Sequence, residues 1–238
     1  MNRIAALAGL VACLLAAPAA AQEGAVEEIV VTGSRMMDWD PDDIPVVQLV
    51  RRADNLIVDV SVVNDTREAG ARRDEITQTL RAMARAAAGR SDIDLSIEDD
   101  GVLVPLTEEM VSTLTLGVDG TRTDTSVASL VVKTPIRPGD TLDGASARIE
   151  SFVEGVREVG RSLADITGDW ELSIVDPPQY RPAILKLIAD DARTAAAAFG
   201  EGYGVRIEGL SNRVTWRQSG PLDLSLFIPY DMAVTRAD

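Results

Sequence analysis

The chain has 238 residues, with 23 lysines and arginines against 38 aspartates and glutamates and no histidine, so its formal charge is −15. The absence of histidine excludes a Ser/His/Asp or Cys/His catalytic arrangement and an imidazole metal site. Nucleic acid is bound mainly through cations that neutralise its phosphates, so a chain this acidic predicts no nucleic-acid partner.

Residues 1–21 have the pattern of a secretory signal peptide. Arg3 supplies the positive start, residues 4–17 are apolar, and residues 19–21 (Ala-Ala-Ala) form a small-residue cleavage site before Gln22. The apolar stretch is shorter than the roughly 20 residues of a membrane-spanning helix. We therefore expect a mature chain that begins near Gln22, has no transmembrane span, and resides in the periplasm of a Gram-negative cell, where outer-membrane association is an option.

The only cysteine, Cys13, lies inside this leader. The mature chain is therefore expected to have no thiol, disulfide or cysteine metal site. As an alternative, residues 10–13 (Leu-Val-Ala-Cys) resemble a bacterial lipobox, in which the cysteine is lipidated and becomes the first mature residue. The apolar run continues past Cys13 and a better cleavage site follows, which favours the signal peptide.

The most distinctive short segment follows the leader. It consists of Glu27, Glu28, Ile29, Val30, Val31, Thr32 and Gly33. Its β-branched residues favour an extended backbone, which can add as a strand to the edge of a partner's sheet. The segment resembles the TonB box of outer-membrane TonB-dependent receptors, which the energy-transducing protein TonB grasps. The resemblance implies that Ile29, Val30, Val31 and Thr32 form the contact strand.

The rest of the chain departs from such a receptor, which needs a plug and a barrel of about 22 strands. The alternative is that the segment is simply the first strand of the fold.

Residues 38–43 (Asp-Trp-Asp-Pro-Asp-Asp) predict an acidic linker, because the glycine and glutamate of a calcium loop are missing at its sixth and twelfth positions. The expected organisation is a signal peptide (1–21), an extended N-terminal arm (22–45) and one domain (46–238).

The first half of the domain begins with a β-branched strand at residues 55–64. A helix follows to residue 88, capped by Asp65 or Thr66 and ended by Gly89; its expected inward face is Ile76, Leu80, Met83 and Ala87. Strands are expected at residues 92–97 and 102–106, joined by a hairpin signal at Asp99, Asp100 and Gly101, and at residues 111–118.

The second half repeats this order. Its expected elements are a strand at 126–134, a helix at 143–164, a strand at 170–175, a helix at 180–199, and strands at 204–210, 213–218 and 222–234. The last helix is expected to face inward through Ile184, Leu187, Ile188, Ala192, Ala195 and Phe199. Strands and helices alternate in two loosely similar halves, which predicts an α+β fold with mostly antiparallel sheet.

The second half also contains three characteristic strings. They are Ser173-Ile174-Val175-Asp176-Pro177, Ala189-Asp190-Asp191-Ala192-Arg193 and Gly204-Val205-Arg206-Ile207. These strings and the order of elements resemble the SIMPL domain family, which includes the periplasmic immunogenic proteins of Gram-negative bacteria. The resemblance spans roughly residues 50–235 and implies a SIMPL-like fold, envelope maintenance or stress tolerance, and a tendency to form homo-oligomers. The chain departs from the family in having only two lysines.

No catalytic constellation is predicted. The acidic pairs Glu108-Glu109, Asp99-Asp100 and Asp190-Asp191 would need burial to raise a pKa, and their flanking sequences favour a solvated surface. Ser34, Ser61 and Ser112 lack the Gly-x-Ser-x-Gly setting of a nucleophile. We therefore expect a protein that is not an enzyme, holds no cofactor or metal, and acts in the cell envelope by protein contact or self-assembly. The alternative is a TonB-interacting adaptor that uses its N-terminal arm as an added strand.

Overall fold

The computed structural model describes residues 28–31, 44–99 and 102–236. The elements are β1 (Glu28–Val31), β2 (Leu49–Arg52), β3 (Asn55–Asn64), α1 (Ala69–Ala88), β4 (Asp94–Asp99), β5 (Val102–Pro105), η3 (Met110–Thr113), β6 (Gly117–Asp119), β7 (Arg122–Pro135), α2 (Leu142–Glu154), β8 (Ser162–Ile166), β9 (Glu171–Val175), η4 (Pro177–Tyr180), α3 (Arg181–Phe199), β10 (Tyr203–Glu208), β11 (Thr215–Gln218), β12 (Asp223–Phe227) and β13 (Asp231–Arg236). The signal peptide, Cys13 and the acidic linker lie outside the described residues.

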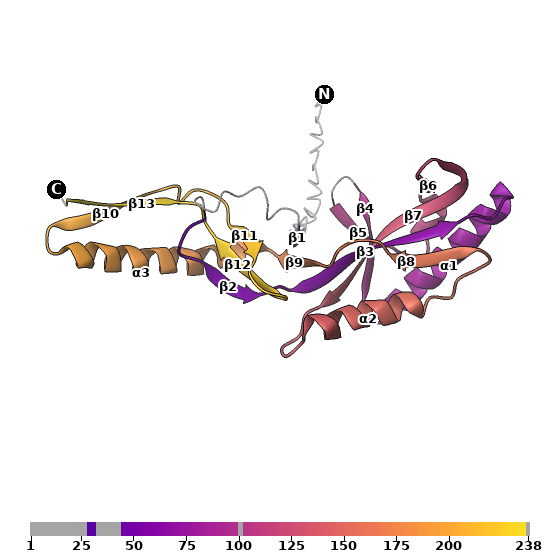
Figure 1. The fold of residues 1–238 in the computed structure, drawn as a ribbon, viewed down its shortest axis with the longest axis horizontal. Helices are drawn as coiled ribbons and strands as arrows, with labels where there is room; N and C mark the ends of the chain where they lie inside the picture. Colours follow the sequence, from indigo (N-terminus) through magenta and orange to yellow (C-terminus); the bar gives the residue numbers. More distant parts are fainter. Residues whose placement is uncertain (1–27, 32–43, 100–101, 237–238) are drawn as a thin grey trace, which may run out of the picture.

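The fold is α+β with antiparallel strands, as predicted. The largest sheet has the order β1-β9-β3-β7-β4-β5, with β6 beside β7 and β8 beside β3. Its two long central strands, β3 and β7, pair from Asn55↔Pro135 to Asn64↔Ser126. Both α1 and α2 pack on one face of this sheet, in a cluster that includes Val60, Ile76 and Ile149 (Figure 1). This end of the molecule is therefore a two-layer structure.

Helix α1 buries the predicted face, since Ile76, Leu80, Met83 and Ala87 all lie in the core. The predicted cap is wrong. The helix begins at Ala69, and the carboxylate of Glu68 accepts hydrogen bonds from the N–H groups of Gly70 and Ala71, at 3.0 and 2.5 Å. Asp65 and Thr66 are engaged elsewhere, with Arg161 and Glu75.

Three predicted elements have different bounds. The helix expected at 143–164 ends at Glu154, and residues 162–166 instead form β8, paired with β3. The strand expected at 111–118 is η3 followed by β6. The strand expected at 222–234 is split into β12 and β13, which belong to different sheets. Pro229 lies at this break, where its missing N–H would interrupt a continuous ladder.

A second core lies around the three-stranded sheet β11-β12-β2. It contains Leu224 and Leu226 of β12, Leu172 and Ile174 of β9, and Ile184 and Ile188 of α3. Trp170 packs against both this core and the core under α1 and α2. The two cores are thus joined through the chain that leads into β9.

Helix α3 and the two-stranded sheet β10-β13 form an extension at one end of the molecule, which we call the distal lobe (Figure 1). Of the six residues predicted to face inward from α3, Ile184 and Ile188 are buried and Ala192 and Ala195 are half-buried. The prediction is wrong for Leu187 and Phe199, which are 38% and 62% exposed. Beyond Ile188 the helix has only this two-stranded sheet beside it, which cannot cover a full apolar stripe.

Among the described residues, no helix has the length and apolarity that a membrane crossing requires.

Candidate functional site

Strand β1 is the outermost strand of the large sheet, and it contains most of the TonB-box-like segment. It pairs with β9 in the register Glu28↔Val175, Ile29↔Ile174, Val30↔Ser173 and Val31↔Leu172. The other three members of the predicted site, Glu27, Thr32 and Gly33, lie outside the described residues. The segment is therefore paired as a strand at a sheet edge, as its β-branched residues predict.

The peptide groups of β9 alternate between its two neighbours. The Ser173 carbonyl accepts a hydrogen bond from the Asp54 N–H at 2.9 Å, on the side of β3. Since peptide groups of successive residues in a strand face opposite sides, those of Leu172 and Ile174 face β1. Leu172 and Ile174 are 1% and 0% exposed. The edge that receives β1 is therefore made of main-chain groups of the buried middle of β9.

Asp54, at the bend between β2 and β3, holds β9 in position. Its Oδ2 accepts the Val175 N–H at 2.8 Å, and its Oδ1 accepts a hydrogen bond from Arg51 at 2.6 Å. The Arg51 guanidinium lies 4.4 Å from the centre of the Tyr180 ring, a cation–π contact. These contacts tie β9 to the second core on the side away from β1, so the edge is presented on a rigid strand.

β1 also lies near β11, with Cα atoms within 8 Å, although the two strands are not hydrogen-bonded to each other. Both edges of β9 are paired, one with β3 and the other with β1. A second strand can therefore reach β9 only by taking the place of β1. The sequence predicted the extended segment 28–31 but not that it pairs with Leu172 and Ile174. Its only hint was the short, largely apolar stretch at residues 171–175.

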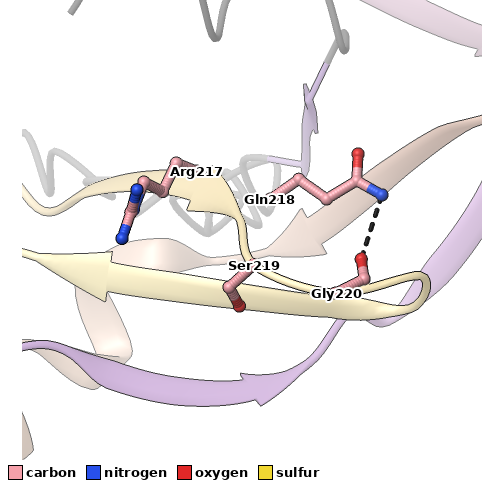
Figure 2. A pocket seen from close by; sticks show the side chains of 4 residues that line it. All are labelled: Arg217, Gln218, Ser219 and Gly220. Carbon is pink, nitrogen blue, oxygen red and sulfur yellow. Dashed lines mark hydrogen bonds between the residues drawn. The ribbon is translucent and has the colours of Figure 1, made fainter. Parts of the chain in front are cut away.

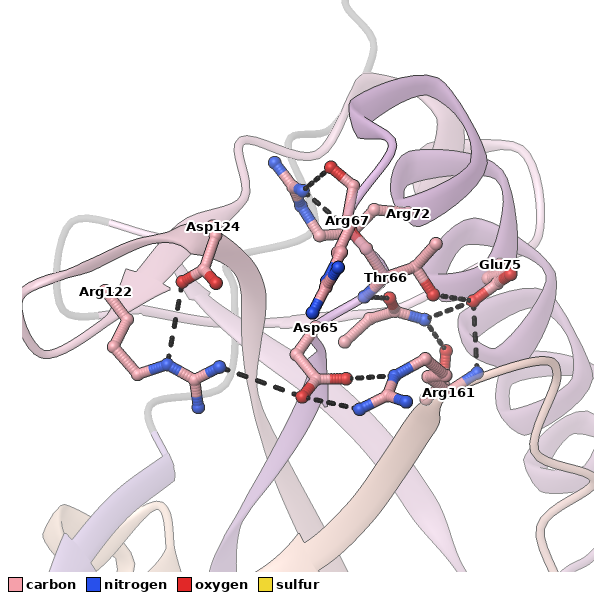
Figure 3. Close-up of polar contacts among 10 residues, drawn as sticks. Asp65, Thr66, Arg67, Arg72, Glu75, Arg122, Asp124 and Arg161 are labelled. Carbon is pink, nitrogen blue, oxygen red and sulfur yellow. Dashed lines mark hydrogen bonds and ion pairs between the residues drawn. The ribbon is translucent and has the colours of Figure 1, made fainter.

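A second polar cluster lies where β3, α1 and β8 meet (Figure 3). Glu75 Oε2 accepts hydrogen bonds from Thr66 Oγ1 at 2.6 Å, from Asn64 Nδ2 at 2.9 Å and from the Arg161 N–H at 3.0 Å. Nδ2 of the wholly buried Asn64 also donates to Ser162 Oγ at 2.9 Å. These bonds, led by that of Thr66, hold the pKa of Glu75 below its ordinary value of 4.5.

The outer layer of this cluster is ionic. The Arg161 guanidinium donates to both oxygens of Asp65, at 2.5 and 2.9 Å, and Arg122 lies 3.7 Å from the same carboxylate. The hydrogen bond from Arg161 is the main cause of a lowered pKa of Asp65. The polar groups of this cluster satisfy one another across three elements, so its arrangement is that of a structural junction.

A shallow depression of about 550 Å³ lies at the turn between β11 and β12 (Figure 2). It is lined by Arg217, Gln218, Ser219 and Gly220. Gln218 Nε2 donates to the Gly220 carbonyl at 3.0 Å, and Arg217 donates to Gln48 Oε1 at 3.3 Å. The depression is open to solvent and its two longest side chains are engaged with the protein, so it does not form an enclosed binding site.

Of the acidic residues singled out in the sequence, Asp190 is engaged with basic side chains at the surface. Asp190 pairs with Lys186 at 3.0 Å and with Arg193 on the surface of α3, and the hydrogen bond from Lys186 is the largest cause of its lowered pKa. General acid catalysis would need a raised pKa. Within the described part of the chain, no cluster of three or more aspartates or glutamates is placed to hold a metal ion.

Comparison with protein-family models found no match, and comparisons with curated proteins and with solved structures found none either.

Proposed function

We propose that this protein is a non-catalytic, exported protein of the Gram-negative periplasm that acts by protein contact or self-assembly. The proposal rests on the lack of buried residues in the distal lobe. None of residues 189–208 and 231–236 is buried, although these residues contain a helix end and a complete two-stranded sheet. Two paired strands are marginally stable alone, and packed elements normally bury one face against a core. A partner that covers this lobe would supply the missing contact.

The tip of the distal lobe carries an exposed aromatic pair. The rings of Phe199 and Tyr203, 62% and 38% exposed, lie 6.0 Å apart across the turn that joins α3 to β10. Aromatic residues contribute large contact area and are enriched in protein interfaces. The SIMPL resemblance, which implies an envelope role and oligomers, supports the same proposal.

The experiment that tests it measures molar mass by light scattering over a range of concentrations. We expect the chain from Gln22 onward to associate and the double variant F199S/Y203S to associate more weakly. The matched control is L163S, since Leu163 is 58% exposed on β8, away from the distal lobe. Equal association of the three proteins, or a monomer at every concentration, would refute self-assembly through this lobe.

A second candidate function is a TonB-interacting adaptor. Its support is the extended form of Glu28–Val31, which strand addition requires; binding to TonB would require these residues to leave β9, with which they pair in the chain itself. Calorimetric titration of the mature protein with the periplasmic domain of the host's TonB tests it, with a variant lacking residues 22–36 as control. If the protein is such an adaptor, we expect saturable binding that disappears in this variant. Absence of binding would exclude the adaptor function.

A further inference from the structure

We infer that the β9 edge formed by the peptide groups of Leu172 and Ile174 is a strand-acceptor site that binds residues 28–31 of a second copy of this chain in place of its own β1. The inference rests on the proposed self-assembly and names a surface through which it occurs. It concerns a different part of the molecule from the distal lobe, so the two can be tested separately.

The β9 edge needs a strand to complete it. Leu172 and Ile174 are wholly buried, and their N–H and C=O groups on this side are directed at β1. Without β1 these groups would form an unpaired sheet edge, and such an edge is a template for pairing with a strand of another chain. One donor strand is therefore expected to be replaced by another.

The chemistry of the site specifies its donor. Recognition is through main-chain hydrogen bonds, which select an extended segment, and the register places Ile29 opposite Ile174 and Val31 opposite Leu172. The same four residues from a second copy satisfy this register equally well. Exchange of an identical element between two molecules keeps every contact at the edge, and it is a recognised route to dimers.

Replacement is the only way in which a second donor can reach β9. Both edges of β9 are already paired, one with β3 and the other with β1. Twelve residues, 32–43, separate β1 from the first described residue of the main body, Ile44. A chain of this length can span about 40 Å when extended, which is enough to reach a neighbouring molecule.

Cysteine cross-linking tests the inference directly. Because the peptide groups of Ser173 face β3, Val30 and Ser173 form a non-hydrogen-bonded pair, with Cα atoms about 4.5 Å apart. A disulfide accepts this separation. The chain from Gln22 onward has no cysteine of its own. The single variants V30C and S173C, carrying tags of different size, are unfolded together, refolded as a mixture and oxidised.

We expect a covalent heterodimer of V30C with S173C, formed about tenfold faster than that of V30C with V175C, because a two-residue offset puts the Cα atoms near 8 Å, beyond disulfide reach. The pair E28C and V175C reports the same register independently if the S173C variant does not fold. The double variant V30C/S173C, oxidised at high dilution, provides the reference for pairing within one molecule.

Two results overturn the inference. One is a V30C and S173C heterodimer that forms no faster than the mismatched pair, while the double variant closes its disulfide only within single molecules. The other is an unchanged molar mass of the associated protein after deletion of residues 22–36. If light scattering nevertheless shows association that depends on Phe199 and Tyr203, the proposed function stands and only the strand exchange fails.

Discussion

The carboxyl carbon of Glu75 lies 2.1 Å from the point that a Cβ atom on Gly160 would occupy. Gly160 also has a φ of +61°, a left-handed conformation that side chains disfavour. The backbone at Gly160 and the carboxylate network of α1 are therefore compatible only because this position has no side chain. The relationship connects two residues far apart in sequence and places the residues just before β8 against α1.

The first prediction concerns this contact. Gly160→Ala is expected to lower the free energy of unfolding by about 2 kcal/mol, since backbone strain at this positive φ adds to the displacement of the flexible Glu75 carboxylate from its hydrogen bonds. Gly139→Ala is the matched control, because Gly139 also has a positive φ, +88°, but nothing within 4 Å of its added Cβ. It is expected to cost about 1 kcal/mol. Urea denaturation measures both, and equal losses would contradict the steric role of Glu75.

The second prediction concerns pH. The pKa of Glu75 is lowered in the folded state, so its ionised form contributes stability above 4.5 that is lost as pH falls through the folded pKa. Glu75→Gln is expected to be less stable than the parent at about pH 6, with the difference narrowing toward about pH 3.5. Thermal unfolding at several pH values measures this. The exposed Glu150 of α2 provides the control variant Glu150→Gln, and a Glu75→Gln deficit that persists unchanged at low pH would disprove the assignment.

The third prediction concerns the turn from β9 into α3. Among the described residues, Asp176 is the only one other than glycine with a positive φ, +47°. Aspartate and asparagine tolerate this conformation, whereas a β-branched residue does not. Asp176→Asn is expected to change the free energy of unfolding by less than about 0.5 kcal/mol and Asp176→Val to lower it by about 2 kcal/mol. Chemical denaturation measures both variants, and equal free energies of unfolding would contradict a left-handed conformation at Asp176.

The fourth prediction concerns the dynamics of the distal lobe. Residues 189–208 contain no buried residue, while α1 buries Ile76, Leu80 and Met83. Backbone amides far from a core open more readily, so hydrogen exchange is expected to be faster in residues 189–199 than in α1 when the protein is dilute. Mass spectrometry of exchanged peptides measures this. If protection of the distal lobe rises with protein concentration, the association occurs through this lobe. Equal exchange rates in residues 189–199 and in α1 would contradict the conclusion that this part of α3 lacks a core.

Much of the fold could be predicted because its signals are local. The pairing of β4 with β5 that the Asp-Gly signal predicts, the apolar face of α1 and the glycine that ends α1 follow from turn chemistry and from helical spacing, and the structure confirms all three. Leu163 shows where this reasoning fails. It continues the apolar spacing of α2, yet it lies in β8 with its side chain 58% exposed, because pairing with β3 is more favourable than another helical turn.

The candidate site could be predicted only in part. The β-branched residues Ile29, Val30 and Val31 indicated an extended segment, but nothing local indicates which edge it joins. That edge is defined by Asp54, which holds Ser173 and Val175 from one side and leaves Leu172 and Ile174 to face the other. Such an arrangement depends on contacts between residues more than a hundred positions apart, and no short pattern contains it.

By itself the sequence determined the α+β class, the order of most elements and the extended character of residues 28–31, since these depend on periodicity, β-branching and turn residues within a few positions. Only the tertiary structure decided that β1 completes the edge of β9, that residues 222–234 divide between two sheets, and that α3 extends beyond its core. Strand pairing and burial depend on which surfaces meet, and that is a property of the whole folded chain.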